Sequence, residues 1–280
     1  MTAPNTPIRL AVAGANGRMG RCTIERALRD GRFELAAALT APDDPALGSN
    51  LSIGDRTIPL GDRFADSDKN PCDVLIDFSV ACGTMVWLPV CERLGIPMVI
   101  GATGHSPAQL ARIGEAACAI PIMRSGNFSL GMNAILAAIG ALVRAVGPEF
   151  DIEIVETHHR HKVDAPSGTA LAILDEIRRA RPTADPSDTG DAGVVFGRRG
   201  KVGQRPPGQI GVHAVRMGEI IGQHEIHLSG GGESITIRHQ AHSREAFAAG
   251  ALSAAAWIAG KPAGLYTMRD VLAARTDPHQ

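Results

Sequence analysis

Between Ile8 and Arg124, short apolar runs alternate with stretches of helical pattern, and this alternation most restricts the folds open to the chain. It is typical of a parallel β-sheet with helices on both faces. Strands are predicted in five short runs, at residues 8–13, 34–39, 74–78, 98–100 and 120–123. The first part of the chain is therefore predicted to be an α/β domain with a Rossmann-like, doubly wound parallel sheet.

The segment from Thr40 to Cys72 interrupts this alternation. It is polar and rich in proline, glycine and aspartate, so we expect a loop there with one weak strand near residues 57–60. A helix is predicted over about residues 129–146, after the last strand of the predicted sheet.

A different pattern begins at Asp151. Residues 151–156, 219–228 and 234–239 show partial period-two alternation, which predicts a mixed or antiparallel sheet with one buried face. Residues 181–209 are dense in proline, glycine, aspartate and arginine, so we expect a surface excursion there.

The last long helix is predicted over residues 243–258 and carries a face of small residues. Such a face suits close packing against a sheet, so this helix can rejoin the first domain. We therefore expect one domain made of residues 1–130 and 243–280, and a second domain, of α+β type, made of residues 131–242.

Composition excludes several classes of protein. The chain has 28 Lys plus Arg against 29 Asp plus Glu, which gives no electrostatic case for nucleic acid or a membrane surface as partner. Its five cysteines form no CxxC pair, which favours a reducing compartment over a disulfide framework. No apolar run approaches the ~20 residues of a membrane span, and no leader pattern precedes Ile8. A cytoplasmic protein is therefore expected.

The first predicted strand ends in a glycine-rich turn with GxxGxxG spacing. Gly14 permits a tight turn, and Gly17 lets the backbone approach a pyrophosphate at the positive end of the following helix. A plain turn remains the alternative, but a turn placed after the first apolar strand and before a long helix favours a dinucleotide. The predicted cofactor-binding residues of this turn are Gly14, Ala15, Asn16, Gly17, Arg18 and Met19.

The sequence leaves open whether the cofactor is NADPH or NADH. The second strand ends in Leu39-Thr40-Ala41-Pro42, without the acidic residue that usually accepts the ribose hydroxyls. Glu34 opens that strand and would lie roughly 16 Å from the binding edge. Arg18 can meet a 2′-phosphate, whereas Asp43 and Asp44 could partly restore NADH binding if their loop folds back.

Two further loops follow strands of the same predicted sheet. They are Phe78-Ser79 and Gly101-Ala102-Thr103-Gly104. Ligands of doubly wound sheets bind outside the carboxyl ends of the strands, so both loops are expected to face the nicotinamide half of the cofactor. Their alternative is that they are ordinary turns between a strand and a helix.

A cationic run stands at residues 158–162, with the sequence His158-His159-Arg160-His161-Lys162. A solvated loop is the usual explanation of such a run. The three histidines also suggest a metal site, but Arg160 and Lys162 would place a dication among like charges, so no metal is expected.

The continuation of this run favours a functional site. Ser167-Gly168-Thr169 leads into a predicted helix over about residues 170–180, and helix starts bind carboxylate or phosphate through free backbone N–H groups. Capping of the helix by Ser167 or Thr169 is compatible with that role. The run and the helix start together suggest a small carboxylate substrate, protonated by histidine, with Lys162 holding an anion or donating a proton.

These residues resemble the dihydrodipicolinate reductase family, also called the 4-hydroxy-tetrahydrodipicolinate reductase family. The stretch from Glu156 to Ala170 is similar to its signature, and supporting matches cover essentially the whole chain. They are Gly14 to Gly20, Asp77-Phe78-Ser79, Gly101 to Gly104, Asn127-Phe128-Ser129 with Gly131 and Asn133, and residues 264–272. The resemblance implies NAD(P)H-dependent reduction of 4-hydroxy-tetrahydrodipicolinate to tetrahydrodipicolinate, a step of diaminopimelate and lysine biosynthesis.

The resemblance also implies roles for single residues. His158 would be the acid/base group, and Lys162 a proton donor that contacts the dicarboxylate substrate. Further substrate contacts would come from His159, Ser167, Gly168 and Thr169, and further cofactor contacts from Phe78, Gly101, Ala102, Thr103, Ser125, Gly126, Asn127 and Phe128.

The family's organisation implies a dinucleotide-binding first domain, and a second domain that binds substrate and builds a homotetramer through its sheet. Two positions depart from the family pattern. The family often has Glu-Arg where this chain has Thr40-Ala41, and commonly Ala-Pro where it has Ser125-Gly126. The ribose contact is therefore not carried over.

Two other functions remain open at this point. One is a Rossmann oxidoreductase acting on another small carboxylate, such as a semialdehyde or hydroxy acid. The other is a nucleotide-sensing protein without catalysis, in which the cationic run would be an effector site.

Overall fold

The computed structural model describes residues 6–64, 70–181 and 193–276. These residues divide into two compact units. The first unit extends to Leu130 and resumes at Arg244, and the second comprises Gly131–Ser243.

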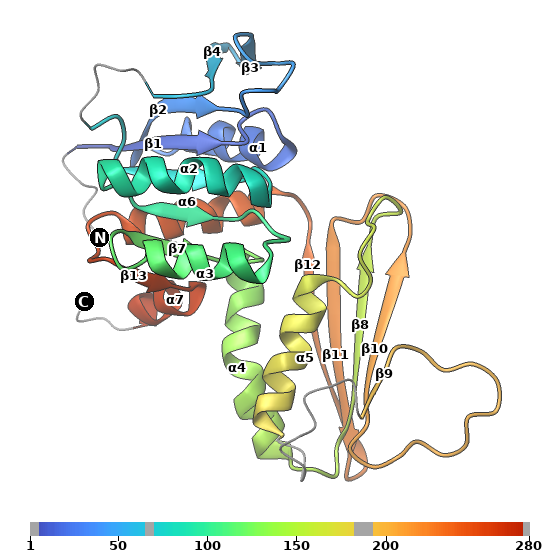
Figure 1. Cartoon of the computed structure of the whole chain (residues 1–280). Coiled ribbons are helices and arrows are strands. Elements are labelled where there is room, and N and C mark those ends of the chain that lie inside the picture. The colour runs from blue at the N-terminus through green and yellow to red at the C-terminus, as the bar shows by residue number, and fades with distance from the viewer. Residues whose placement is uncertain (1–5, 65–69, 182–192, 277–280) are drawn as a thin grey trace. The chain divides into compact units, whose positions relative to one another are not determined.

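The first unit is built on an eight-stranded sheet with the strand order β13-β7-β6-β5-β1-β2-β4-β3 (Figure 1). Neighbouring strands are parallel except β3 and β4, which form an antiparallel pair. The strands are β1 (Ile8–Ala13), β2 (Phe33–Leu39), β3 (Asn50–Ile53), β4 (Arg56–Gly61), β5 (Val74–Asp77), β6 (Met98–Ile100), β7 (Pro121–Arg124) and β13 (Gly264–Tyr266).

Helices cover both faces of this sheet, as the Rossmann-like prediction requires. The helices are α1 (Arg18–Ala27), α2 (Ala81–Leu94), α3 (Pro107–Ala116), α6 (Glu245–Ile258) and α7 (Met268–Thr276). Side chains of β1 alternate between two cores: Leu10 and Val12 pack with α1, α6 and α7, whereas Ala11 and Ala13 pack with α2 and α3. The predicted doubly wound sheet is confirmed.

The polar segment before β5 contains two strands, whereas the sequence predicted one. β4 occupies the predicted position, and β3 precedes it, joined by a turn at Gly54 with φ +55°. Leu51 of β3 is fully buried. The prediction missed β3 because four residues with one buried side chain show too little alternation to stand out from a loop.

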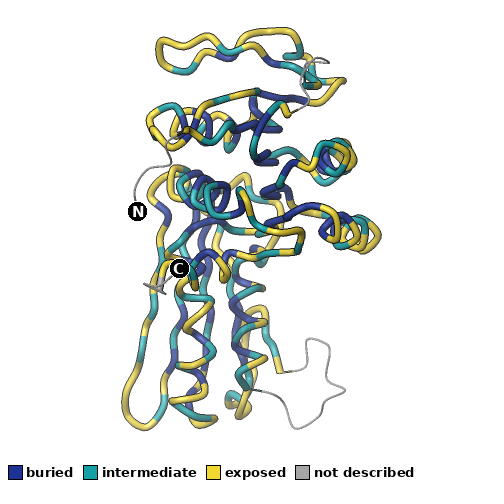
Figure 2. The backbone as a smooth tube through the Cα atoms, turned by 90° about the vertical axis from the view of Figure 1, so that its left-hand side faces the viewer, coloured by how far each residue is buried: buried dark blue, intermediate teal, exposed yellow. Residues whose placement is uncertain are grey.

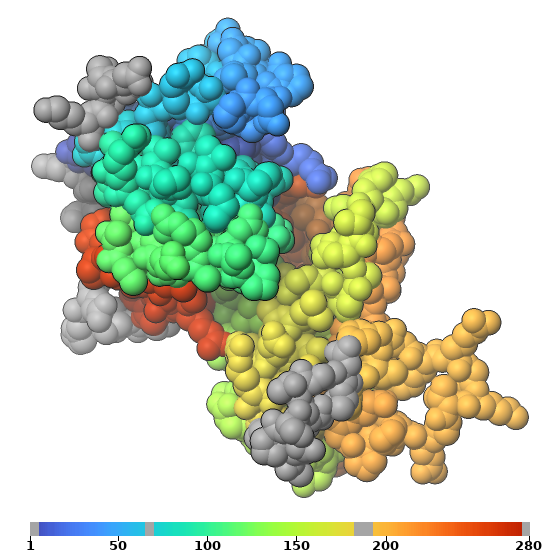
Figure 3. Space-filling view, viewed as in Figure 1, coloured from blue at the N-terminus to red at the C-terminus, as the bar shows by residue number. Residues whose placement is uncertain are grey.

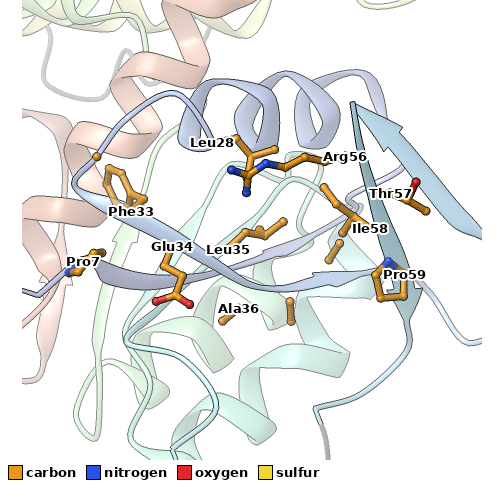
Figure 4. Close-up of a pocket in the computed structure, with 13 residues that line it drawn as sticks. Pro7, Leu28, Phe33, Glu34, Leu35, Ala36, Arg56, Thr57, Ile58 and Pro59 are labelled. Atoms are coloured by element: carbon orange, nitrogen blue, oxygen red, sulfur yellow. The ribbon is translucent and has the colours of Figure 1, made fainter. Parts of the chain in front are cut away.

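A cavity of about 750 Å³ opens between β2 and β4 (Figure 4). The paired residues of these strands are Ala38 with Leu60 and Leu39 with Gly61, all at their carboxyl ends. The strands diverge toward their amino ends, where Glu34 and Arg56 line the gap. The glycine turn follows the opposite, carboxyl end of β1, so this cavity is not the predicted cofactor site.

The second unit has a five-stranded mixed sheet, with the order β12-β11-β8-β10-β9. Pairs β12–β11 and β11–β8 are antiparallel, and β8–β10 and β10–β9 are parallel. The elements are α4 (Leu130–Val146), β8 (Asp151–His158), α5 (Gly168–Ala180), β9 (Val194–Val195), β10 (Ile210–Arg216), β11 (Gly222–Gly230) and β12 (Glu233–Ala241). β9 and β10 were not predicted.

One face of this second sheet is buried against α4 and α5. Along β8, Ile152 and Ile154 point into that core, whereas Asp151 and Glu153 point away from it. Figure 2 shows buried and exposed positions following one another along the backbone. The partial period-two pattern of the sequence therefore came from a sheet with one buried face.

Residues 196–209 connect β9 to β10 without helix or strand. This segment, in orange, projects outward from the strands of its unit (Figure 3). It belongs to the predicted surface excursion, of which residues 182–192 lie outside the described residues.

No helix in the described ranges is long and apolar enough to cross a membrane.

Candidate active site

The glycine turn packs so tightly that side chains would collide with backbone at two of its three glycines. Gly14 has φ +71°, and a Cβ there would lie 2.6 Å from the carbonyl oxygen of Phe78. A Cβ on Gly20 would lie 2.1 Å from the carbonyl oxygen of Gly14. Gly17 directly precedes α1 and has no side chain to cover the first-turn amide groups. This arrangement leaves room for a pyrophosphate at the helix start, so these residues fit a dinucleotide.

The other predicted cofactor loops lie at the same edge of the first sheet. A Cβ on Gly101 would lie 2.3 Å from the ring of Phe78. That ring contacts Phe128 edge to face, with centroids 5.9 Å apart. Ser125 holds the Phe128 loop, because its hydroxyl donates to the carbonyl of Asn127 at 2.7 Å. The loops after β5, β6 and β7 therefore converge beside the glycine turn.

Phe128 itself is only 2 % exposed. It rests on α6, where a Cβ on Gly250 would lie 1.7 Å from its carbonyl oxygen. The ring of Phe128 thus supports the Phe78 loop by packing, and a direct cofactor contact of Phe128 stays a prediction.

Asp77 ties two of these loops together, one through its side chain and the other through its backbone carbonyl. Asp77 is fully buried, and its side chain accepts hydrogen bonds from the backbone N–H of Ser79 at 2.9 Å and from the hydroxyl of Thr84 at 2.6 Å. Its carbonyl accepts from the N–H of Gly101 at 2.8 Å. Burial raises the pKa of Asp77 above its ordinary value. Asp77 belongs to the Asp77-Phe78-Ser79 motif but was given no role from sequence.

An acidic side chain does reach the carboxyl end of β2. Asp44 accepts hydrogen bonds from the hydroxyl of Thr40 at 2.6 Å and from the amide of Asn16 at 2.7 Å. These bonds, with the backbone N–H of Ala46, lower the pKa of Asp44 below its ordinary value. The loop after β2 thus folds back, which was the condition set for Asp44 to matter.

In the second unit, His158 ends β8 and is held by a buried carboxylate. Its Nδ1 donates to Oε2 of Glu156 at 2.6 Å. Glu156 is 0 % exposed and also accepts two hydrogen bonds from the guanidinium of Arg216. Burial alone would raise the pKa of Glu156, but hydrogen bonds from His158, Arg216 and Ser167 outweigh it and lower that pKa to about 2.

Lys162 lies in the loop after β8 and pairs with Asp164. Its ammonium lies 2.7 Å from Oδ1 and 2.9 Å from Oδ2 of that carboxylate. Burial opposes ionisation of Asp164, but the hydrogen bond from Lys162 prevails and lowers the pKa of Asp164. The loop is also closed by the backbone N–H of Lys162, which donates to the carbonyl of His159 at 3.1 Å.

The start of α5 has the cap that the sequence allowed. Ser167 is buried, and its hydroxyl accepts from the N–H of Ala170 at 3.2 Å. The same hydroxyl lies 3.1 Å from Nε2 of His224. Because this hydroxyl is engaged within the protein, a contact of Ser167 with substrate stays a prediction; Gly168 is exposed at the first position of the helix.

Three residues of this site were missed by sequence reasoning. Glu156 carried a detectable signal, because two residues along a strand place side chains on the same face as His158. Arg216 and His224 carried none, because they come from β10 and β11 and reach the site through strand pairing. Among the described residues, no group of three or more His, Cys, Asp and Glu side chains could hold a metal ion.

A glycine turn on a parallel sheet, converging loops beside it, and a carboxylate-held histidine next to a helix start define an NAD(P)-dependent oxidoreductase. The chain belongs to the dihydrodipicolinate reductase family. The family's N-terminal model matches residues 8–128, and its C-terminal model matches residues 131–272.

Two curated relatives, each named 4-hydroxy-tetrahydrodipicolinate reductase, align over almost their whole length. The one from Myxococcus xanthus is 37% identical over 270 residues, covering 95% of this chain and 97% of the relative. The one from Acinetobacter baumannii is 39% identical over 272 residues, covering 94% and 96%. The family resemblance inferred from motifs is confirmed.

Solved structures share the fold. A dipicolinate-bound dihydrodipicolinate reductase from Paenisporosarcina sp. TG-14 has a TM-score of 0.70 at 24% identity, covering 94% of this chain and 98% of that one. An aspartate semialdehyde dehydrogenase II from Vibrio cholerae has a TM-score of 0.53 at 11% identity, covering 97% and 100%. At these identities the likeness concerns the fold alone.

Proposed function

We propose that this chain reduces 4-hydroxy-tetrahydrodipicolinate to tetrahydrodipicolinate with NADPH or NADH, in the diaminopimelate route to lysine. The substrate gains a hydride and a proton, and its 4-hydroxyl group leaves as water. The names of the curated relatives support the substrate. The observation that carries the chemistry is the pairing of His158 with Glu156 beside the start of α5. It combines a proton donor with a place for a carboxylate.

His158 supplies the proton of the reaction. Reduced nicotinamide supplies the hydride when it is bound. Because Nδ1 of His158 faces Glu156, Nε2 is the nitrogen left to hold a proton for the substrate. Gly222 keeps this atom accessible, since a Cβ there would lie 3.1 Å from Nε2.

Lys162 and the start of α5 hold the dicarboxylate. The ammonium of Lys162 exchanges its partner Asp164 for a carboxylate of the substrate. From that position Lys162 can also donate a proton to the substrate. Gly168 and Thr169 present backbone N–H groups at the positive end of α5, and His159 adds a further substrate contact.

Asp44 favours NADH over NADPH. The carboxylate lies beside Asn16 of the glycine turn, where a dinucleotide's ribose is expected. Its lowered pKa keeps it ionised at neutral pH, so it can accept ribose hydroxyls and repel a 2′-phosphate. Arg18, exposed in the same turn, reduces but does not cancel this repulsion.

The second sheet builds a homotetramer. Its face away from α4 and α5 carries polar and charged side chains, among them Glu225 of β11 and Arg238 of β12. These side chains form an ion pair at 3.4 Å within the chain, and self-complementary charges of this kind suit a symmetric interface.

A cytoplasmic location follows from the same biosynthetic role and from the cysteines. All five are free thiols, at positions 22, 72, 82, 91 and 118, as a reducing compartment maintains them.

Steady-state oxidation of NADH, with substrate generated in situ, tests the function. We expect His158→Gln to lower kcat by roughly 10²–10⁴ while NADH affinity, measured by calorimetry, is kept. His161→Gln is the matched control, because His161 lies in the same run but is exposed, and its contacts are with Glu219 at 3.4 Å and with the ring of His159. Wild-type turnover in His158→Gln would refute the role of His158, and NADH binding without turnover in the wild type would favour a nucleotide sensor.

A further inference from the structure

We infer that Glu156 and Arg216 are positioning residues for the reaction: together they fix the ring of His158 and the start of α5 in one arrangement. The inference deepens the proposed function and rests on the role given there to His158. Neither residue needs to touch the substrate for this role.

The carboxylate of Glu156 is shared between the two parts of the site. Oε2 accepts from His158 Nδ1 at 2.6 Å, and Oε1 accepts from the backbone N–H of Ser167 at 2.9 Å. Arg216 donates a second hydrogen bond to each oxygen, to Oε2 at 2.8 Å and to Oε1 at 2.7 Å. One buried group thus sets the position of both the proton donor and the anion-binding helix start.

Arg216 extends this connection to the loop between them. Strand register places it opposite His158 on β10, and its guanidinium also donates to the carbonyl of Asp164 at 2.6 Å. The loop that carries Lys162 is therefore anchored to the same arginine. A bidentate arginine suits this task because its planar fork fixes the carboxylate in orientation as well as in place.

The carboxylate of Glu156 determines which ring nitrogen of His158 can donate a proton to the substrate. An ionised carboxylate only accepts hydrogen bonds, so Nδ1 must carry the hydrogen and Nε2 faces outward. This is the arrangement by which a buried acid orients a histidine in hydrolytic triads. The ring of His158 thus has the carboxylate of Glu156 at Nδ1, and the cation of Arg216 lies on the same carboxylate.

Other titratable groups lie near His158 besides Glu156 and Arg216. Lys162 and Asp164 lie in the following loop, and His224 of β11 packs edge-on with its centroid 5.2 Å away. Burial, aided by the positive charge of His158, lowers the pKa of His224 to about 3. His224 is therefore neutral near pH 7 and does not replace His158 as the proton donor.

The pH profile of kcat separates positioning from a purely structural role. Glu156→Gln removes the anion, so we expect kcat to fall by roughly 10² or more and the alkaline limb of the profile to move to lower pH. Arg216→Met removes the cation and should move that limb to higher pH. Arg216→Lys, which keeps the charge, should restore the wild-type limb with a smaller loss of kcat.

A matched pair outside the site provides the control. Arg112 of α3 and Glu92 of α2 form a similar bidentate pair. Glu92→Gln and Arg112→Met should leave the pH profile unchanged, even where they lower the melting temperature.

Two measurements keep the inference testable if Glu156→Gln does not fold. ¹⁵N NMR of the wild-type protein should find the hydrogen of neutral His158 on Nδ1, and Arg216→Met should bind pyridine-2,6-dicarboxylate (dipicolinate) more weakly than Arg216→Lys. Two results would overturn the inference: a hydrogen on Nε2 of neutral His158, or an alkaline limb of the kcat–pH profile that stays at the wild-type pH in both Glu156→Gln and Arg216→Met. If His158→Gln also keeps wild-type turnover, the proposed function fails instead.

Discussion

Asp44 reaches the cofactor edge through a folded-back loop rather than from the end of the strand, where an acidic residue is usually found. Thr40 and Asn16 hold it there through hydrogen bonds of 2.6 and 2.7 Å. Thr40 itself is only 2 % exposed, so at this position it serves the carboxylate and not the ribose. The chain thus restores a negative charge that its Thr40-Ala41 pair lacks.

Asp44→Asn tests this role at single-residue scale. It keeps the shape of the side chain and removes its charge, so the repulsion of a 2′-phosphate disappears. We expect the ratio of kcat/KM for NADPH to that for NADH to rise at least about tenfold. Asp43→Asn, at the exposed neighbouring position, should leave the ratio unchanged, and an equal effect of the two variants would refute the specific role of Asp44.

Among the elements, β8 carries charge on both of its faces. On the inner face Glu156 serves the candidate active site, and on the outer face Glu153 holds the segment between β9 and β10. Glu153 accepts from Arg198 at 2.8 Å, from His213 at 2.6 Å and from Arg205 at 3.2 Å. Burial opposes the ionisation of Glu153, but these hydrogen bonds outweigh it and lower its pKa to about 2.

Removing Glu153 should loosen the segment of residues 196–209 in a pH-dependent way. Its folded pKa lies below the ordinary value of 4.5, so its stabilisation is present above that value and is lost as pH falls toward 2. Glu153→Gln should therefore unfold at lower urea than the wild type at pH 7, with a smaller difference below pH 4. Deuterium exchange should rise in residues 196–209.

The exposed Glu233→Gln, at the start of β12, provides the comparison for Glu153→Gln. Glu233→Gln should change neither the urea unfolding midpoint nor the deuterium exchange of residues 196–209. A difference between Glu153→Gln and the wild type that stays constant from pH 7 to pH 3 would contradict the assignment.

The strands differ in whether the sequence predicts them. The strands β1, β5 and β6 were predicted because most of their residues are apolar, and most of these are buried. β10 escaped because its seven residues, from Ile210 to Arg216, include Gly211, His213 and Arg216, which break the apolar pattern. Those residues are polar or small because they face Glu153 and Glu156. The residues that contact these two carboxylates therefore removed the apolar pattern by which a strand is predicted.

The same reasoning explains what was found in the candidate active site. His158 and Lys162 belong to one continuous run, so the sequence displays them together. Arg216 lies 60 residues from Glu156 along the chain, and only strand pairing brings the two together. Contacts of that kind carry no local signal.

For the whole molecule, assembly is the property to measure. We expect light scattering after size exclusion to give four times the mass of a single chain. Arg238→Glu reverses a charge on the outward sheet face and should shift the population toward smaller species. Arg93→Glu, at the end of α2 in the first unit, should not, and a monomeric wild type would refute the tetramer.

The return of the chain to the first unit has a consequence for its synthesis. The core that covers one face of the first sheet includes Ala251, Leu252 and Ile258 of α6, which leave the ribosome after the whole second unit. The second unit is continuous in sequence and can fold as soon as it emerges. The dinucleotide-binding sheet, although begun first, must wait with one face incompletely covered, and this is the interval in which a chaperone would be needed most.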